Sequence, residues 1–253
     1  MILTDDDFAT IVRAVELGRG LYDNLAKYVF FQMGALVGFI ATFLGASIFN
    51  VAAGVPFLPL QTLWVNFTTQ VFQAIGLGYG KPDPDLMQRK PRPADERILP
   101  RERLAWLSFL GLVLGVGTLA VLAWAERAHG TDLARTMGLT TFSLFNLFLS
   151  FTVKDELRSV FSLDTFDDRR FVLMSGMSVA AIVLATELRP FQRLLKTVEL
   201  DLTQWIVCIL VAASVLVVTE IYKAVQRARV AGAAPPTSTA STGAGVGAAG
   251  AKV

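Results

Sequence analysis

The segment Leu63–Gln73 reads LWVNFTTQVFQ and places polar side chains inside an otherwise apolar stretch of about residues 57–79. That stretch is long enough to cross a hydrocarbon core about 30 Å thick as a helix. Four of its polar side chains are spaced i, i+3, i+4 and i+7: Asn66, Thr69, Gln70 and Gln73. This spacing predicts one polar face on an α-helix. Because polar groups at membrane depth need partners, we expect the face to point into a helix bundle or a wet cavity.

The polar face has two possible roles. Its amide and hydroxyl oxygens are hard ligands of the kind that bind a dehydrated cation. The same groups can instead form hydrogen bonds that hold neighbouring helices together. The spacing alone fits both roles.

The composition of the whole chain favours an integral membrane protein. Of its 253 residues, 53% are hydrophobic and only 17% are charged, and the mean hydropathy is +0.53. Soluble domains carry about a quarter charged residues. The single Cys208 excludes an internal disulfide, and the single His129 excludes a multi-histidine metal site. The net charge of +2 is too small to indicate nucleic-acid binding.

Six apolar stretches predict an all-α membrane protein built as a six-span helix bundle. They run over residues 28–49, 57–79, 104–125, 137–153, 171–187 and 204–222. With both termini in the cytoplasm, 18 of the 23 basic residues fall on the cytoplasmic side, as the positive-inside rule requires. We therefore expect a multi-pass protein of the cell membrane, with the lipid bilayer as a partner and both termini cytoplasmic.

The two ends of the chain differ from the spans. Residues 1–27 are charged and too polar to cross a membrane. Residues 230–253 are rich in Ala, Gly, Ser and Thr, and they lack the large apolar side chains that offset the entropy of ordering. We predict that this tail is disordered.

Small residues inside two spans predict close helix packing. Gly34 and Gly38 form a GxxxG pattern in the first span, and Gly111 and Gly115 form another in the third. Such patterns let two helix backbones approach each other.

The interior of the first five predicted spans contains no Asp or Glu. Proton relays and tight divalent-cation sites normally use carboxylates. Within these spans the sequence therefore offers a cation neutral oxygens alone.

Four stretches follow one another along the chain: Leu3–Leu25, Leu63–Gln70, Pro82–Arg92 and Asp201–Trp205. Together they resemble the C-terminal third of a P-type cation-transporting ATPase of the calcium-pump-like branch. The resemblance implies the end of the phosphorylation domain and a stalk over residues 1–27. It also implies transmembrane helices five to ten of that family over residues 28–229.

The resemblance also implies a membrane cation site. The family's Asn-x-x-Thr-Asp pattern on helix six is similar to Asn66-x-x-Thr69-Gln70 here, with an amide in place of the carboxylate. The family's helix-eight glutamate falls at Asn146. We therefore predict Asn66, Thr69, Gln70 and Asn146 as the residues that bind the transported cation.

Three carboxylates of the family site are thus missing. The helix-five Asn and Glu of the family fall at Leu36 and Phe39, which cannot bind a cation. A unit charge about 4 Å from an ion contributes about 4 kcal/mol at an effective dielectric constant of about 20. We therefore expect transport of one ion per cycle rather than two calcium ions.

The resemblance assigns a coupling role to the stalk. Tyr22, Asn24 and Lys27 would transmit movement of the phosphorylation domain to the membrane. A solvated charged helix face is the alternative interpretation of these residues.

The family's catalytic motifs are missing from the sequence. It contains neither the Asp-Lys-Thr-Gly-Thr phosphorylation loop nor the Gly-Asp-Gly-x-Asn-Asp magnesium loop. We therefore expect a fragment of an ATP-driven cation transporter, with no catalytic residues and no ATPase activity of its own. ATP and magnesium are expected for the full-length parent only, and the missing N-terminal pump domains are expected as partners. The alternative is a non-catalytic membrane scaffold or regulatory remnant.

Overall fold

The computed structural model describes residues 8–80, 86–88, 100–154 and 167–233. Every regular element in these ranges is helical. The elements are α1 (Phe8–Ile48), η1 (Val51–Gly54), α2 (Pro59–Trp64), η2 (Val65–Gln70), α3 (Val71–Gly78), α4 (Arg101–His129), α5 (Thr131–Lys154), α7 (Arg169–Glu187), α8 (Arg189–Leu195) and α9 (Leu202–Ala233).

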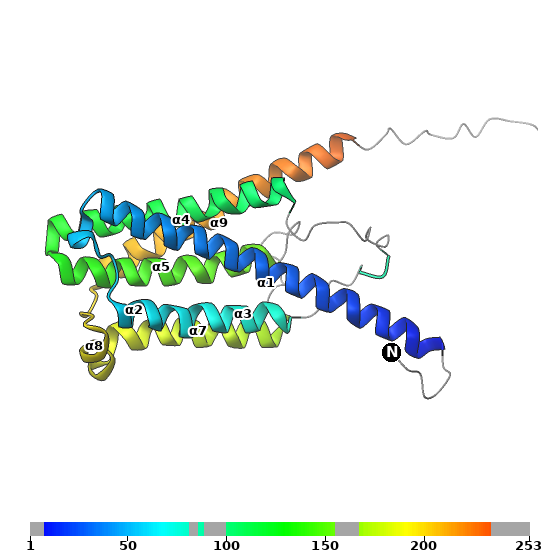
Figure 1. The fold of residues 1–253 in the computed structure, drawn as a ribbon, viewed down its shortest axis with the longest axis horizontal. Helices are drawn as coiled ribbons and strands as arrows, with labels where there is room; N and C mark the ends of the chain where they lie inside the picture. The colour runs from blue at the N-terminus through cyan, green and yellow to red at the C-terminus, as the bar shows by residue number, and fades with distance from the viewer. Residues whose placement is uncertain (1–7, 81–85, 89–99, 155–166, 234–253) are drawn as a thin grey trace, which may run out of the picture.

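The predicted all-α membrane bundle is confirmed. Five helices are long and apolar enough to cross a membrane: α1, α4, α5, α7 and the Leu202–Val225 part of α9. The predicted second span consists of three consecutive helical pieces, α2, η2 and α3, and the count of six spans stays a prediction. Figure 1 shows these pieces running alongside α7, with α1, α4 and α5 on the other side.

Two helices extend beyond the expected span limits. α1 runs without interruption from Phe8 to Ile48, so the predicted stalk and the first span form one helix. α9 reaches Ala233, inside the segment that we predicted as a disordered tail. Residues 1–7, most of the loop after α3 and residues 234–253 lie outside the described residues. The first seven residues of the predicted phosphorylation-domain end and the rest of the predicted tail fall there.

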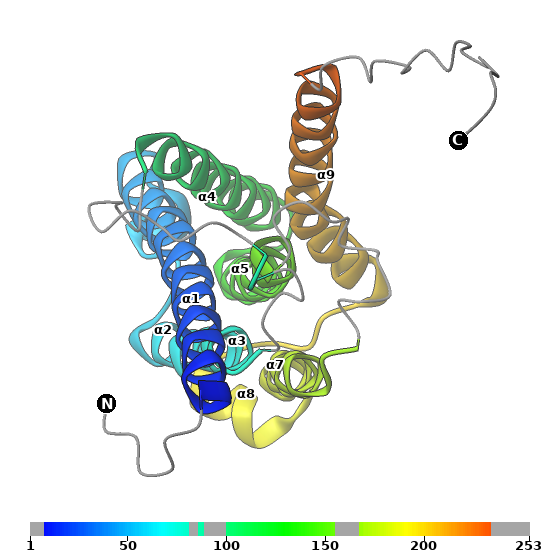
Figure 2. The same ribbon diagram turned by 90° about the vertical axis from the view of Figure 1, so that its right-hand side faces the viewer.

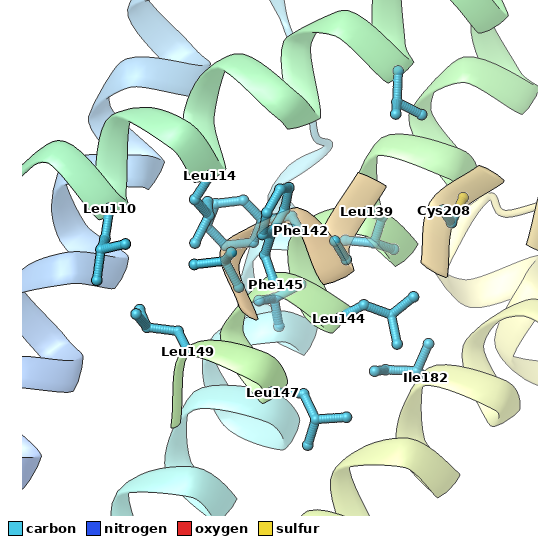
Figure 3. Close-up of a cluster of buried hydrophobic side chains, with 14 of the residues drawn as sticks. Leu110, Leu114, Leu139, Phe142, Leu144, Phe145, Leu147, Leu149, Ile182 and Cys208 are labelled. Atoms are coloured by element: carbon cyan, nitrogen blue, oxygen red, sulfur yellow. The ribbon is translucent and has the colours of Figure 1, made fainter. Parts of the chain in front are cut away.

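α5 is the central helix of the bundle. Of its most apolar stretch, 89% is buried, compared with 22% for α9. Figure 2 shows α5 with α3, α4, α7 and α9 arranged around it. Its Phe142, Phe145 and Leu149 are fully buried, and Figure 3 shows them packed near Leu114 of α4. The apolar outer faces of the surrounding helices are thus left for lipid.

The glycine patterns of α1 and α4 allow the close approach that the sequence predicts. A Cβ atom added at Gly111 would lie 2.7 Å from the Gly34 carbonyl oxygen, and one at Gly115 would lie 3.1 Å from that of Gly38. Real Cβ atoms essentially never come within 3.0 Å of another heavy atom. The prediction of glycine-mediated packing is confirmed.

Candidate functional site

The polar segment Leu63–Gln73 forms a helix with a π-helical centre. Pro59 lies in the first turn, where its missing N–H costs nothing, and the Gln61 side chain accepts a hydrogen bond from the Leu58 N–H. The Gln61 amide then donates to the Leu195 carbonyl oxygen of α8 at 2.9 Å. At the end of η2, the Val71 N–H donates to the backbone carbonyl oxygen of Asn66, five residues earlier. Single π-turns of this kind occur frequently at functional sites.

A pocket of about 430 Å³ lies between η2–α3 and α1. Asn66 and Gln70 contribute amide groups to its wall, and Tyr28 and Gln32 of α1 add a phenol and a further amide. The structure therefore brings two of the four predicted cation-binding residues into one pocket. Four neutral polar side chains line this space, and its lining contains no carboxylate.

Leu36 and Phe39 of α1 also line this pocket. These are the positions where the resemblance implies two cation ligands. Phe39 stacks on Phe43 with ring centroids 4.5 Å apart and meets the edge of Phe142 at 5.9 Å. An apolar, aromatic surface therefore forms the part of the pocket wall where the resemblance implies cation ligands from α1.

Thr69 and Asn146 lie outside the lining of this pocket, in the packed interior where η2 contacts α5. The Asn146 amide nitrogen donates to the Phe142 carbonyl oxygen at 2.8 Å. Within the described part of the chain, the Asn146 Oδ1 and Thr69 Oγ1 atoms are buried without a hydrogen-bond partner. A buried unsatisfied acceptor costs about 1–3 kcal/mol. Native proteins keep only a few such groups, and each calls for an explanation such as an ordered water or an ion.

Gln73 departs from the predicted common face. Its Oε1 atom accepts hydrogen bonds from Ser150 of α5 at 2.6 Å and from Ser175 of α7 at 3.4 Å. Its amide nitrogen donates to Ser178 of α7 at 3.0 Å. The wide π-turn of η2 explains the difference, because i→i+5 bonding changes the direction of side chains that an uninterrupted α-helix would align. The polar residues thus divide into a pocket set and an interhelical hydrogen-bonding set.

The predicted stalk residues are close to the end of α3. The Asn24 side chain, 7% exposed, donates to the carbonyl oxygens of Gly80 at 2.7 Å and Gly78 at 3.3 Å. Lys27 is buried and forms an ion pair with Asp23 at 3.0 Å, and Tyr22 is half-buried one turn earlier. Because Asn24 holds the last carbonyls of α3, the stalk is mechanically joined to the helix that carries the pocket.

A strained turn between α1 and α2 was not predicted. Ala52 and Ala53 adopt left-handed backbone conformations, with φ of 53° and 56°. The Glu126 carboxylate accepts from the Ala52 N–H at 2.8 Å, and the Arg135 guanidinium donates to the oxygens of Ala52 and Val55. Left-handed alanines cost about 1–2 kcal/mol each. Their persistence therefore depends on these two charged side chains, for which the local sequence gives no signal.

The fold and the pocket together define a multi-pass helical membrane protein with a neutral polar site at a π-helical segment. The family model described as cation transporting ATPase, C-terminus, matches residues 54–225, and the chain belongs to this family.

Relatives from several organisms agree with this assignment. Calcium-transporting ATPase 1 of Schizosaccharomyces pombe is 32% identical over 225 residues, covering 88% of this chain and 25% of the relative. Calcium-transporting ATPase 1 of Bacillus cereus is 32% identical over 240 residues, covering 88% and 27%. The probable cation-transporting ATPase F of Mycobacterium tuberculosis is 31% identical over 219 residues, covering 86% and 24%. The chain thus spans about a quarter of the length of these relatives.

Proposed function

We propose that this chain is the C-terminal membrane portion of an ATP-driven cation transporter and forms part of its ion-binding site. The observation that carries the proposal is the pocket beside η2, where Asn66 and Gln70 face Gln32 and Tyr28 of α1. Amide oxygens at membrane depth have few uses other than helix packing or ion binding. These two amides line a space of about 430 Å³, which leaves room for a ligand.

Two of the unpartnered oxygens among the described residues support the same proposal. Thr69 Oγ1 and Asn146 Oδ1 supply hard ligands within the packed interior next to η2. A cation that passes between the pocket and this interior would satisfy both and offset their desolvation cost.

The charge of the site supports transport of a single cation per cycle. Among the described residues, no cluster of three or more His, Cys, Asp or Glu side chains could hold a metal ion. Neutral oxygens bind a divalent ion much more weakly than carboxylates do, since each carboxylate contributes a full charge.

The proposal includes partners and an orientation. ATP, magnesium and the phosphorylated aspartate belong to the N-terminal domains of the longer transporter, which act on this chain through the α1 stalk. The location is the cell membrane, and the positive-inside rule supports an orientation with both termini in the cytoplasm. The hydrogen bonds from Asn24 to the end of α3 supply the route from stalk to site.

Ion-stimulated ATPase activity of the complete transporter tests the site. We expect Gln70→Ala to lower the apparent cation affinity at least about tenfold, because a coordinated oxygen is lost. Gln70→Glu should instead raise the affinity for divalent cations, since it adds a charge next to the ion. Gln204→Ala is the matched control, because this glutamine caps the first turn of α9 by accepting from the Asp201 N–H.

The stalk has a separate test. Asn24→Leu should lower ATP turnover while leaving cation affinity, measured at equilibrium, within about twofold.

Unchanged affinity and turnover in both Asn66→Ala and Gln70→Ala would overturn the site assignment. Normal turnover in Asn24→Leu would overturn the coupling role alone.

A further inference from the structure

A second pocket of about 340 Å³ lies between α1, α4, α5 and α9 and shares no lining residue with the first. Its polar wall comes from Glu102 and Arg103 of α4 and from Tyr222 and Lys223 of α9, with Trp106 and Phe30 beside them. Two cations and one carboxylate thus meet in one small concavity.

The pocket lies where the apolar parts of two helices end. Arg103 immediately precedes the apolar run of α4, and Lys223 follows that of α9. In Figure 1 the first turns of α4 and the C-terminal half of α9 lie at the same end of the bundle as the N-terminal half of α1. Trp106 and Tyr222 lie at this level, and such aromatic side chains typically occupy the membrane–water interface. The pocket is therefore at the depth of lipid head groups.

The pocket wall is ordered by packing. The Trp106 and Tyr222 rings stack with centroids 3.7 Å apart, and the Arg103 guanidinium lies 5.0 Å from the centroid of the Phe30 ring. Lys223 is 3% exposed, although it is a lysine near the end of a span. The hydroxyls of Thr152 and Thr219 donate to carbonyls of their own helices, and the full charges in the pocket wall come from Glu102, Arg103 and Lys223.

We propose that this pocket binds the head group of a membrane phospholipid. The phosphate lies between Arg103 and Lys223, where charge-assisted hydrogen bonds are strongest. The outer part of the head group donates hydrogen bonds to Glu102. Phosphatidylglycerol and phosphatidylethanolamine provide such donors, whereas the methylated ammonium of phosphatidylcholine does not. Basic pockets between transmembrane helices are known to bind the head groups of anionic lipids such as cardiolipin.

The surroundings of the pocket favour a lipid over a soluble phosphate compound. Phe109 on α4 and Ile221 on α9 are exposed, at 47% and 60%, close in sequence to the pocket residues. Phe109 also packs against Trp106 with ring centroids 5.6 Å apart. Acyl chains that descend from a head group in the pocket would cover these apolar side chains. A soluble phosphate would leave them without that contact.

Native mass spectrometry of the full chain, purified in detergent and stripped of lipid, tests the proposal. Phosphatidylglycerol, phosphatidylethanolamine and phosphatidylcholine are added at equal concentrations, with inorganic phosphate as the soluble probe. We expect one molecule of phosphatidylglycerol or phosphatidylethanolamine to be retained at least about tenfold more tightly than phosphatidylcholine. Inorganic phosphate should not raise the thermal unfolding midpoint.

Arg103→Gln should weaken lipid retention at least about tenfold. Arg101→Gln is the matched control, because Arg101 is exposed on the same helical turn but does not line the pocket. Glu102→Gln should reduce the preference over phosphatidylcholine. Arg103 and Glu102 are exposed, so these variants should fold, and lipid-free unfolding midpoints verify this.

Two results would overturn the proposal. One is equal loss of lipid in the Arg101 and Arg103 variants, which would indicate a general surface-charge effect. The other is stabilisation by inorganic phosphate that depends on Arg103, which would assign the pocket to a soluble ligand. The proposal depends on membrane insertion and is independent of cation transport, so its failure leaves the proposed function untouched.

Discussion

Replacing Gly111 by alanine tests the contact that joins the stalk helix α1 to α4. The new Cβ would lie 2.6 Å from the Val37 Cβ and 2.7 Å from the Gly34 carbonyl oxygen. Ordinary contact begins at 3.4 Å, so the backbones must separate by about 0.7 Å along this line. Overpacking of this kind costs about 1–3 kcal/mol. Replacing Gly by Ala in a helix also gains about 1 kcal/mol, which offsets part of this cost. We therefore expect the free energy of unfolding to fall by up to about 2 kcal/mol.

Thermal unfolding of the full chain in detergent, followed by circular dichroism, measures this loss. Gly176→Ala in α7 is the matched control, because a Cβ there meets no heavy atom within 4 Å. It should stabilise the chain by about 0.5–1 kcal/mol through helix propensity alone. If Gly111→Ala proved as stabilising as Gly176→Ala, the close approach of α1 and α4 would be refuted.

Two other contacts give predictions. Gln73→Leu removes the hydrogen-bond partner of three serines. Each hydrogen bond in a membrane is worth about 0.6 kcal/mol, so this variant should lower the free energy of unfolding by about 2 kcal/mol in the same assay. Ser175→Ala, which removes the longest of these bonds, should cost less than a third of that, and equal losses would refute the role of Gln73 as a hub. Arg135→Gln should raise amide hydrogen exchange in residues 50–55, because the strained turn loses a clamp. In the Arg135→Gln background, adding Ala52→Gly should recover about 1 kcal/mol of the free energy of unfolding, because glycine adopts the left-handed conformation without strain. Unchanged hydrogen exchange in Arg135→Gln alone would contradict the clamp.

Most of the helical architecture could be predicted from the sequence. Runs of apolar residues identify spans because a bilayer forces every backbone polar group into internal hydrogen bonds. The GxxxG patterns indicated the faces of α1 and α4 that approach each other, since a glycine has no side chain to hold a neighbouring backbone away. The length of α1 could not be read from hydropathy, because a polar helix outside the membrane carries no hydropathy signal, and only the resemblance implied a stalk over residues 1–27.

The candidate site was only partly predictable. Asn66 and Gln70 could be paired from their spacing, and they do line one pocket. The interhelical role of Gln73 could not, because the π-turn that redirects it depends on hydrogen bonds within the folded helix. The clamp by Glu126 and Arg135 joins residues more than 70 positions apart. No local pattern encodes such a contact.

By itself the sequence determined that this is a helical membrane protein, which segments are apolar enough to span, and that the interior of the first five predicted spans holds neutral polar side chains and no Asp or Glu. These properties follow from side-chain chemistry and from the bilayer as a solvent. The tertiary structure alone decided which polar groups share a pocket, which are used up in hydrogen bonds between helices, and which are left without a partner. The physical reason is that hydrogen-bond satisfaction depends on the positions of several helices at once, and a one-dimensional spacing cannot contain them.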